Sequence, residues 1–216
     1  MEKVILFDLD GTLIDSTDAI VECFYFAFKE QKFNFKGCTE DIKKEIGYPL
    51  DIMFGNLGVD KQKVWDFVDS YKSKYRKISI EKTALLKNAK QSVELASTFA
   101  RLGVVTTKTT LYSIPLLEHF GIMKYFEVII GRQEVENPKP HPEPIYKAIE
   151  AMNLKITKNI YMIGDTKLDI IAANEANISS VAVLSGYGTK EDLSGYTNII
   201  VTDSLEAVNL IKNKQF

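Results

Sequence analysis

The 216-residue chain is long enough for one domain, or for one domain with a modest insertion, and too short for a large multidomain machine. It is 45% hydrophobic and 26% charged, which is typical of a folded globular protein and not of a disordered or fibrous one. Its net charge of -2, without long runs of lysine or arginine, argues against nucleic acid as a partner and favours small solutes.

The amino-terminal apolar run is interrupted by Asp8 well before signal-peptide length, and no stretch approaches the length of a membrane span. We therefore expect no membrane association and a cytoplasmic location. Cys23 and Cys38 are too few for a disulfide framework and are predicted to be reduced thiols. His119 and His141 carry no catalytic pattern and are predicted to be structural or solvated.

The first predicted strand, residues 4–7, is continuously apolar, as parallel strands covered by helices on both faces are. Further strands are predicted at residues 104–105, 126–130, 160–163, 181–184 and 199–201. Helical patterns lie between them, with one apolar face at Ala89, Val93, Ala96, Phe99 and Ala100 and another at Ile145, Ala148, Ile149 and Met152. This alternation of strands and helices predicts an α/β fold with a Rossmann-like parallel sheet.

Residues 16–81 break the alternation because they contain no convincing strand pattern. We predict a small helical domain there, inserted into a core made of residues 1–15 and 82–216. Its helix-terminus signals are Ser16 as a possible cap, Thr39 before two acidic residues, and Gly47 as a stop. Its aromatic residues are expected to form its own core and not a ligand platform: Phe24, Phe28, Trp65, Phe67, Tyr71 and Tyr75.

Two carboxylates, Asp8 and Asp10, directly follow the first predicted strand. In extended backbone, residues two apart point to the same side, so we expect these carboxylates to converge. Like charges this close need a cation, and Mg²⁺ is the usual choice where a substrate phosphate completes the set of ligands. The alternative is a surface turn with two solvated acids, which the longer strand-terminal motif disfavours.

A second acidic cluster, Asp165 and Asp169, follows the strand predicted at residues 160–163. Ligands bind at the carboxyl edge of open parallel sheets, so Asp165 is expected to reach the cation held by Asp8. Asp169 belongs to the start of the next helix. There it either stabilises the first turn or supports the metal ligands from behind, and we expect the supporting role.

Thr106 and Lys139 follow two other predicted strands and so share this edge. Alone, a threonine that finishes a strand or a solvated lysine indicates nothing. A hydroxyl and an ammonium beside a carboxylate and a cation are what a transferring phosphoryl group requires, because its charged oxygens must be neutralised. The prolines on either side of Lys139 are expected to keep its backbone rigid.

These segments together resemble the haloacid dehalogenase superfamily. The resemblance rests on Asp8-Leu9-Asp10-Gly11-Thr12, then Thr106, Lys139, and Gly164-Asp165 with Asp169, in the family's order. The inserted residues 16–81 are similar to the family's smaller cap, and residues 7–16, residues 47–50 and Lys139-Pro140 are similar to phosphoglycolate-phosphatase-like members. Thr107 departs from the subgroup, which often has asparagine there, so either Thr106 or Thr107 could be the motif threonine.

The resemblance implies a role for each matching residue. Asp8 attacks phosphorus and becomes an aspartyl phosphate, while Asp10 protonates the leaving oxygen and later activates water. Mg²⁺ is held by Asp8, Asp165 and the backbone carbonyl of Asp10. The residues expected to contact the phosphate or the rest of the substrate are Gly11, Thr12, Thr106, Thr107, Lys108 and Lys139. The resulting prediction is a phosphoric monoester hydrolase that acts on a small phosphorylated metabolite.

The same fold also supports other activities. Dehalogenation is disfavoured because relatives with that activity lack the aspartate found here at Asp10. A sugar phosphomutase and an inorganic pyrophosphatase stay open, since cap residues and water access decide between them and a phosphatase. A non-enzymatic scaffold is disfavoured because it has no reason to keep every motif residue. Phosphoglycolate, pyrophosphate, a sugar phosphate and a nucleotide all remain candidate substrates, and the oligomeric state is open.

Overall fold

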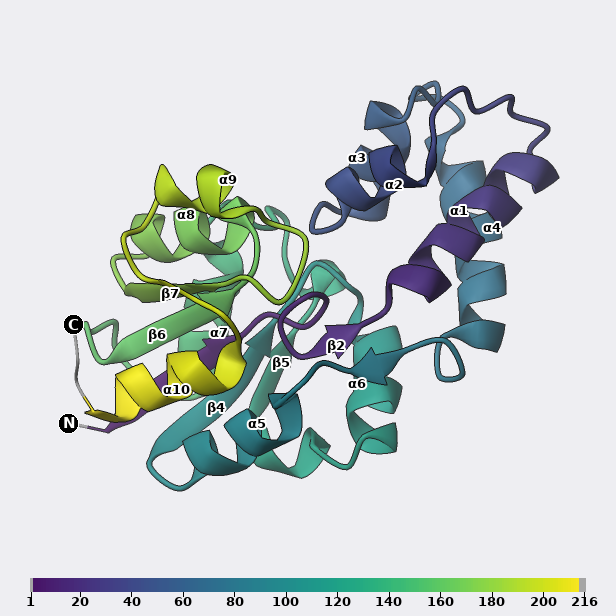
Figure 1. Cartoon of the computed structure of the whole chain (residues 1–216). Coiled ribbons are helices and arrows are strands. Elements are labelled where there is room, and N and C mark those ends of the chain that lie inside the picture. The colour runs from purple at the N-terminus through teal and green to yellow at the C-terminus, as the bar shows by residue number, and fades with distance from the viewer. Residues whose placement is uncertain (1, 214–216) are drawn as a thin grey trace.

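The computed structural model describes residues 2–213. Within them lies a six-stranded sheet of order β5-β4-β1-β6-β7-β8, and all neighbouring strands are parallel (Figure 1). The strands are β1 (Lys3–Phe7), β4 (Ala100–Val105), β5 (Val128–Ile130), β6 (Ile160–Gly164), β7 (Ser179–Val183) and β8 (Ile200–Val201). The predicted α/β fold with a parallel sheet is confirmed.

Helices cover both faces of this sheet. They are α5 (Ala89–Ser97), α6 (Thr110–His119), α7 (Glu143–Ala151), α8 (Lys167–Glu175), α9 (Lys190–Ser194) and α10 (Ser204–Asn213), with single 3₁₀ turns at Met123–Tyr125 and Arg132–Glu134. In β1, Ile5 and Phe7 pack into the core shared with α5, α6 and α10, whereas Val4 and Leu6 pack into the core shared with α7 and α8. This two-sided burial explains the continuous apolar run.

Several predicted element limits are wrong, and Ala100 and Phe126 show why. Ala100 was assigned to the face of a helix, but it begins β4 and pairs with Lys3 of β1, because α5 already ends at Ser97. Phe126 was assigned to a strand, but its N–H closes the preceding 3₁₀ turn on Met123, and β5 begins only at Val128. Residue-level limits depend on strand pairing and turns, which apolar runs do not encode.

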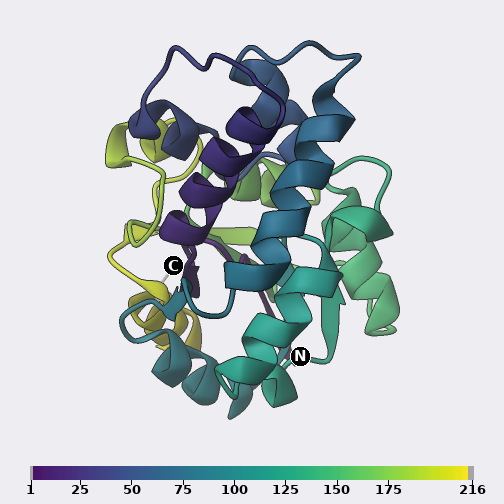
Figure 2. The same ribbon diagram turned by 90° about the vertical axis from the view of Figure 1, so that its right-hand side faces the viewer.

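The main elements of the inserted segment are helices. It contains α1 (Thr17–Glu30), α2 (Thr39–Glu45), α3 (Leu50–Asn56) and α4 (Val64–Ile78), and Figure 2 shows α1 and α4 side by side above the sheet. These helices enclose their own apolar cluster, in which Phe24 contacts Phe54 and Tyr71 at ring-centroid distances of 4.4 and 5.2 Å. Trp65 was expected in this cluster, but it is 60% exposed, because neighbouring residues of α4 form the buried face.

A short antiparallel pair, β2 (Ile14–Asp15) and β3 (Ala84–Leu85), connects the inserted helices to the sheet. We propose that residues 16–81 form a cap domain, on the support of their separate core and of these paired connections. Ser16 precedes α1 as expected, but its hydroxyl makes no cap and donates to the Asp10 carboxylate instead. Gly47 lies just beyond α2 at a positive φ of 113°.

Both cysteines of the cap are free thiols. Cys23 is buried, and burial raises the pKa of its thiol to about 12, whereas Cys38 is exposed. Across residues 2–213, none of the helices has the length and apolarity that a bilayer crossing would need.

Candidate active site

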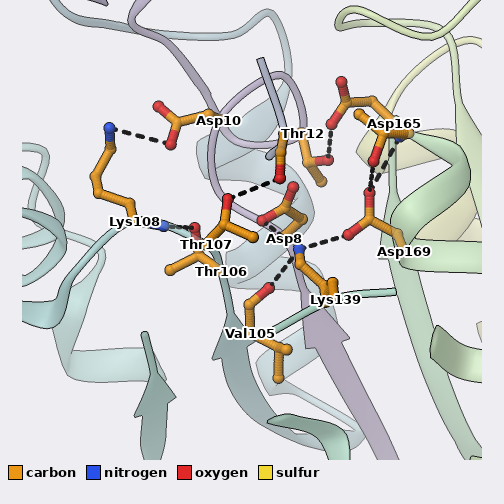
Figure 3. A network of polar contacts seen from close by, with 12 residues as sticks. Asp8, Asp10, Thr12, Val105, Thr106, Thr107, Lys108, Lys139, Asp165 and Asp169 are labelled. Atoms are coloured by element: carbon orange, nitrogen blue, oxygen red, sulfur yellow. Dashed lines mark hydrogen bonds and ion pairs between the residues drawn. The ribbon is translucent and has the colours of Figure 1, made fainter. Parts of the chain in front are cut away.

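Three carboxylates converge at the carboxyl edge of the sheet (Figure 3). Asp8 follows β1, Asp165 follows β6, and Asp169 lies in the first turn of α8. One oxygen of each lies within 4.8 Å of the others, and the three residues are 4%, 0% and 0% exposed. The neighbouring positions of β1 and β6 therefore bring Asp8 and Asp165 together across more than 150 residues of sequence.

Lys139 places one ammonium group among these carboxylates. Its Nζ lies 2.9 Å from Asp8 Oδ1 and 2.6 Å from Asp169 Oδ1, and it donates to the Val105 carbonyl at 2.9 Å. Lys139 is itself only 3% exposed. Although burial opposes its charge, the two carboxylates raise the pKa of Lys139, so it stays protonated.

The single ammonium group of Lys139 does not balance the three carboxylates of Asp8, Asp165 and Asp169. Burial and the neighbouring Asp169 raise the pKa of Asp8 to about 7, and Lys139 only partly opposes them. Burial, Asp8 and Asp169 likewise raise the pKa of Asp165 well above its usual value. The site thus holds more negative charge than its own positive groups offset, and a bound cation would neutralise the excess.

The donor set fits Mg²⁺, because carboxylate and carbonyl oxygens are the ligands that this ion prefers. Asp8 contacts Lys139 through Oδ1, and Asp165 accepts one hydrogen bond on each oxygen, from Thr12 and Tyr187, so both keep lone pairs for a cation. Asp169 is engaged more fully, because Oδ1 contacts Lys139 and Oδ2 accepts from both the backbone and the hydroxyl of Thr166. Asp169 therefore positions Lys139 and caps α8 at the same time.

Asp10 lies outside this cluster. Strand β1 ends at Phe7, so extended geometry does not continue to Asp10, and its carboxylate does not join the Asp8 cluster as the sequence spacing suggested. Asp10 Oδ2 instead lies 3.1 Å from Lys108 Nζ, and Oδ1 accepts from the Ser16 hydroxyl. Asp10 thus faces the cavity between the cap and the core.

The threonines have different surroundings. Thr106 directly follows β4 and is 4% exposed, and its Oγ1 accepts from the Lys108 N–H at 3.2 Å. The Thr107 hydroxyl donates to the Gly47 carbonyl of the cap at 2.9 Å, so it is already engaged. Thr12, expected to contact substrate, donates to Asp165 Oδ1 at 2.9 Å.

A loop after β7 supports Asp165 and was missed by the sequence analysis. The Tyr187 N–H donates to Asp165 Oδ2 at 2.8 Å, and the Ser185 hydroxyl donates to the Gly11 carbonyl at 2.8 Å. A Cβ atom on Gly186 would lie 2.1 Å from Asp165 Oδ2, so a glycine is required there. The signal was a glycine-rich turn directly after a predicted strand at the same sheet edge.

Gly11 contacts the site from the other side. Its φ is +84°, and a Cβ there would lie 2.3 Å from Asp165 Oδ2. Gly11, expected at the substrate, therefore packs against a carboxylate of the cluster. The two histidines lie elsewhere and are exposed: His119 ends α6, and His141 Nδ1 accepts from the Glu143 N–H at 3.1 Å.

A cavity of about 290 Å³ lies beside Asp10 between the cap and the core. It is lined from the cap by Gly47, Tyr48 and Leu50, which belong to the segment 47–50 that is similar to phosphoglycolate-phosphatase-like members. Lys108 enters it between Asp10 and the ring of Tyr75, whose centroid is 4.7 Å from Lys108 Nζ. Burial opposes the charge of Lys108, but Asp10 and Tyr75 raise its pKa.

A family model for haloacid dehalogenase-like hydrolases matches residues 5–183, which include every site residue described so far except those of the Ser185–Tyr187 turn. The chain belongs to the haloacid dehalogenase-like hydrolase family. It is 30% identical over 206 residues to a phosphoglycolate phosphatase of Colwellia psychrerythraea, with 90% of each chain covered. It is 34% identical to the pyrophosphatase PpaX of Oceanobacillus iheyensis, covering 84% of this chain and 83% of that protein.

Solved structures of the family have the same fold. A putative haloacid dehalogenase-like hydrolase from Bacteroides fragilis superposes with a TM-score of 0.89 at 26% identity, covering 96% of this chain and 100% of that one. The match extends over both the sheet and the inserted helices, since almost the whole chain is covered.

Proposed function

We propose that this hydrolase is a Mg²⁺-dependent phosphatase that acts on small phosphorylated metabolites through an aspartyl phosphate on Asp8. The observation that carries the proposal is the buried cluster of Asp8, Asp165 and Lys139, which adjoins a cavity containing a separate carboxylate, Asp10. This arrangement supplies a nucleophile, positive charge for the phosphoryl oxygens, and an acid on the side of the leaving group.

Each residue has a step that its surroundings support. Asp8 attacks phosphorus, and the bond to the leaving oxygen breaks as the aspartyl phosphate forms. Lys139, 2.9 Å from Asp8, neutralises a phosphoryl oxygen, and Thr106 is placed to donate to another. Asp10 gives its proton to the leaving oxygen and later takes one from the attacking water. Lys108 and Ser16 hold the Asp10 side chain for both transfers.

The residues that would hold Mg²⁺ are Asp8, Asp165 and the backbone carbonyl of Asp10. When bound, the ion neutralises phosphoryl oxygens and offsets the surplus negative charge of the cluster. Thr12 and Tyr187, which donate to the two oxygens of Asp165, would keep that carboxylate in one orientation.

Turnover of p-nitrophenyl phosphate tests this function. With Mg²⁺ we expect nitrophenol and inorganic phosphate in equal amounts, which also distinguishes hydrolysis from phosphoryl transfer to another position of a sugar. Excess chelator should stop the reaction, and fresh Mg²⁺ should restore it. Undiminished turnover in chelator would contradict the metal dependence. The absence of hydrolysis of any phosphate ester or of pyrophosphate would contradict the phosphatase.

A further inference from the structure

The cavity beside Asp10 has one wall made by a single face of α4. Trp65, Val68, Lys72 and Tyr75 follow one another at spacings of three and four residues, and all four line the cavity. Such spacing places side chains on one stripe of a helix. Trp65 is 60% exposed although the cap has an aromatic core of its own, so this indole is available at the cavity and is not used in packing.

The other walls are also largely apolar or aromatic. They include Ile20, Ile46, Tyr48, Leu50, Met53 and Tyr112. The volume of about 290 Å³ is close to the lower end of ligand pockets, roughly 300 to 1,000 Å³. A two-carbon acid or a second phosphate would leave most of this space and most of these walls without contact.

The charged side chains of the cavity carry both signs. Lys108 is paired with Asp10 at 3.1 Å, and Asp51 adds a further acid to the lining. Lys72 and Arg132 also line the cavity, and Arg132 donates one N–H to the Val135 carbonyl at 3.0 Å. These charges do not by themselves select an anionic or a neutral leaving group, but the apolar and aromatic walls favour one that is apolar over much of its surface.

Polar atoms in the same walls offer a few directed contacts. Thr109 Oγ1 is buried and has no hydrogen-bond partner among residues 2–213. The side chain of Gln133 lies in the lining as well, where its amide pairs with the backbone N–H and the hydroxyl of Thr110. Apolar walls with a small number of polar atoms are typical of small-molecule sites.

We infer that the substrate is a phosphomonoester whose leaving group carries a flat ring, as in a nucleoside 5′-monophosphate. The ring packs against Trp65 and the apolar walls, and the phosphate reaches Asp8. This inference rests on the proposed phosphatase function and narrows its substrate class. It selects nucleotides over phosphoglycolate, pyrophosphate and simple sugar phosphates.

A matched substrate pair tests the ring directly. Adenosine 5′-monophosphate and ribose 5-phosphate share the ester and the sugar but differ in the base. We expect kcat/KM for the nucleotide to be at least about tenfold higher, the size of effect that base stacking on an aromatic side chain gives. Equal values, or a preference for ribose 5-phosphate, would overturn the inference while the phosphatase function stood.

Two variants test whether Trp65 is the side chain that contacts the ring of the substrate. Trp65→Ala should lower kcat/KM for the nucleotide about tenfold and change that for ribose 5-phosphate less than twofold. Tyr25→Ala removes another exposed cap aromatic, 42% exposed and outside the cavity lining, and should change neither value. A loss shared equally by both substrates in Trp65→Ala would contradict a contact with the ring.

Binding can be followed without turnover because Trp65 is the single tryptophan of the chain. Adenosine should change the tryptophan emission in a saturable way, and ribose should not. If no phosphate ester were hydrolysed, the proposed function would fail. This titration would still show whether a flat ring binds beside Trp65. No saturable change with adenosine would then overturn the inference as well.

Discussion

Lys139 determines how the buried charges of the site are distributed. It contacts both Asp8 and Asp169, at 2.9 and 2.6 Å, so the carboxylate that we propose as the nucleophile and the one that caps α8 share a single ammonium. Within residues 2–213, Asp165 contacts no ammonium group and is held by the Thr12 hydroxyl and the Tyr187 N–H. Each carboxylate thus has a different set of contacts, which is consistent with the separate roles proposed for them.

Asp8→Asn should remove turnover with little change in the fold. The amide keeps the shape of the side chain but loses the nucleophilic oxygen and a metal-binding charge, so we expect at least about a hundredfold loss in kcat. Circular dichroism would check the fold, and Asp69→Asn, an exposed acid on α4, is the matched control. A rate above a hundredth of wild type would exclude Asp8 as the nucleophile.

The raised pKa of Asp8 predicts how the metal-free protein responds to pH. The folded state keeps the Asp8 proton up to about pH 7, whereas the unfolded chain releases it near 3.8, so folding loses free energy as pH rises between these values. In chelator, Asp8→Asn should therefore gain stability relative to wild type between pH 5 and 7, by up to about 3 kcal/mol. Calorimetry in chelator at both pH values measures this difference, and a difference independent of pH would contradict it.

Among the elements, the loop between β7 and α9 is the least tolerant of added bulk. A Cβ on Gly186 would approach Asp165 Oδ2 to 2.1 Å and the Gly11 carbonyl to 2.6 Å. Gly186→Ala should displace Asp165 and raise the Mg²⁺ concentration for half-maximal activity about tenfold or more, the range seen when groups supporting a metal ligand are lost.

Gly195→Ala is the control for this substitution. Gly195 ends α9, and a Cβ there meets nothing within 4 Å, so its Mg²⁺ dependence should equal that of wild type. Activity assayed against Mg²⁺ concentration compares the two variants. An unchanged Mg²⁺ requirement in Gly186→Ala would show that the loop does not support a metal ligand.

The sequence alone was sufficient to predict strands that are buried on both faces along their whole length. Residues 4–7 and 160–163 are apolar on both sides because helices cover both faces of the sheet, so their runs predict buried strands. The pair β2 and β3 was missed because two residues per strand carry no periodicity. Trp65 was misplaced because an amphipathic pattern cannot distinguish a helix face that fills a core from one that lines a cavity.

Sequence patterns are limited in the same way for the candidate active site. The sequence predicts four site residues at one edge of the sheet because each follows a predicted strand: Asp8, Thr106, Lys139 and Asp165. The contacts of Asp10 with Lys108 and Ser16, and of Thr12 with Asp165, depend on how the chain turns after Phe7. Such turns join residues by tertiary packing, which strand patterns do not specify.

Over the whole molecule, the cap contacts the core around the cavity through a few polar links. The Thr107 hydroxyl donates to Gly47, and Thr17 and Tyr187 share a hydrogen bond of 3.0 Å between their hydroxyls. Lys108 adds a contact with the ring of Tyr75. A substrate bound in this cavity would therefore have to fit between the proposed cap and the core.

This arrangement predicts selectivity by size. A cavity of about 290 Å³ between the domains cannot contain a folded protein segment, so a phosphopeptide should have a kcat/KM at least about a hundredfold below that of the best small metabolite, since a misplaced phosphate alone costs about that factor. Parallel assays with equal Mg²⁺ would measure both. A phosphopeptide that outperformed every metabolite would show that the cap does not exclude large substrates.

The paired strands β2 and β3 bring the two ends of the inserted segment to adjacent positions, with Ile14 opposite Leu85 and Asp15 opposite Ala84. A closed loop of this kind can be lengthened, shortened or replaced without moving β1 and β6, which Asp8 and Asp165 directly follow. Over evolutionary time, the chemistry and the choice of substrate can therefore change independently, one by substitutions in the sheet and the other by exchange of a module.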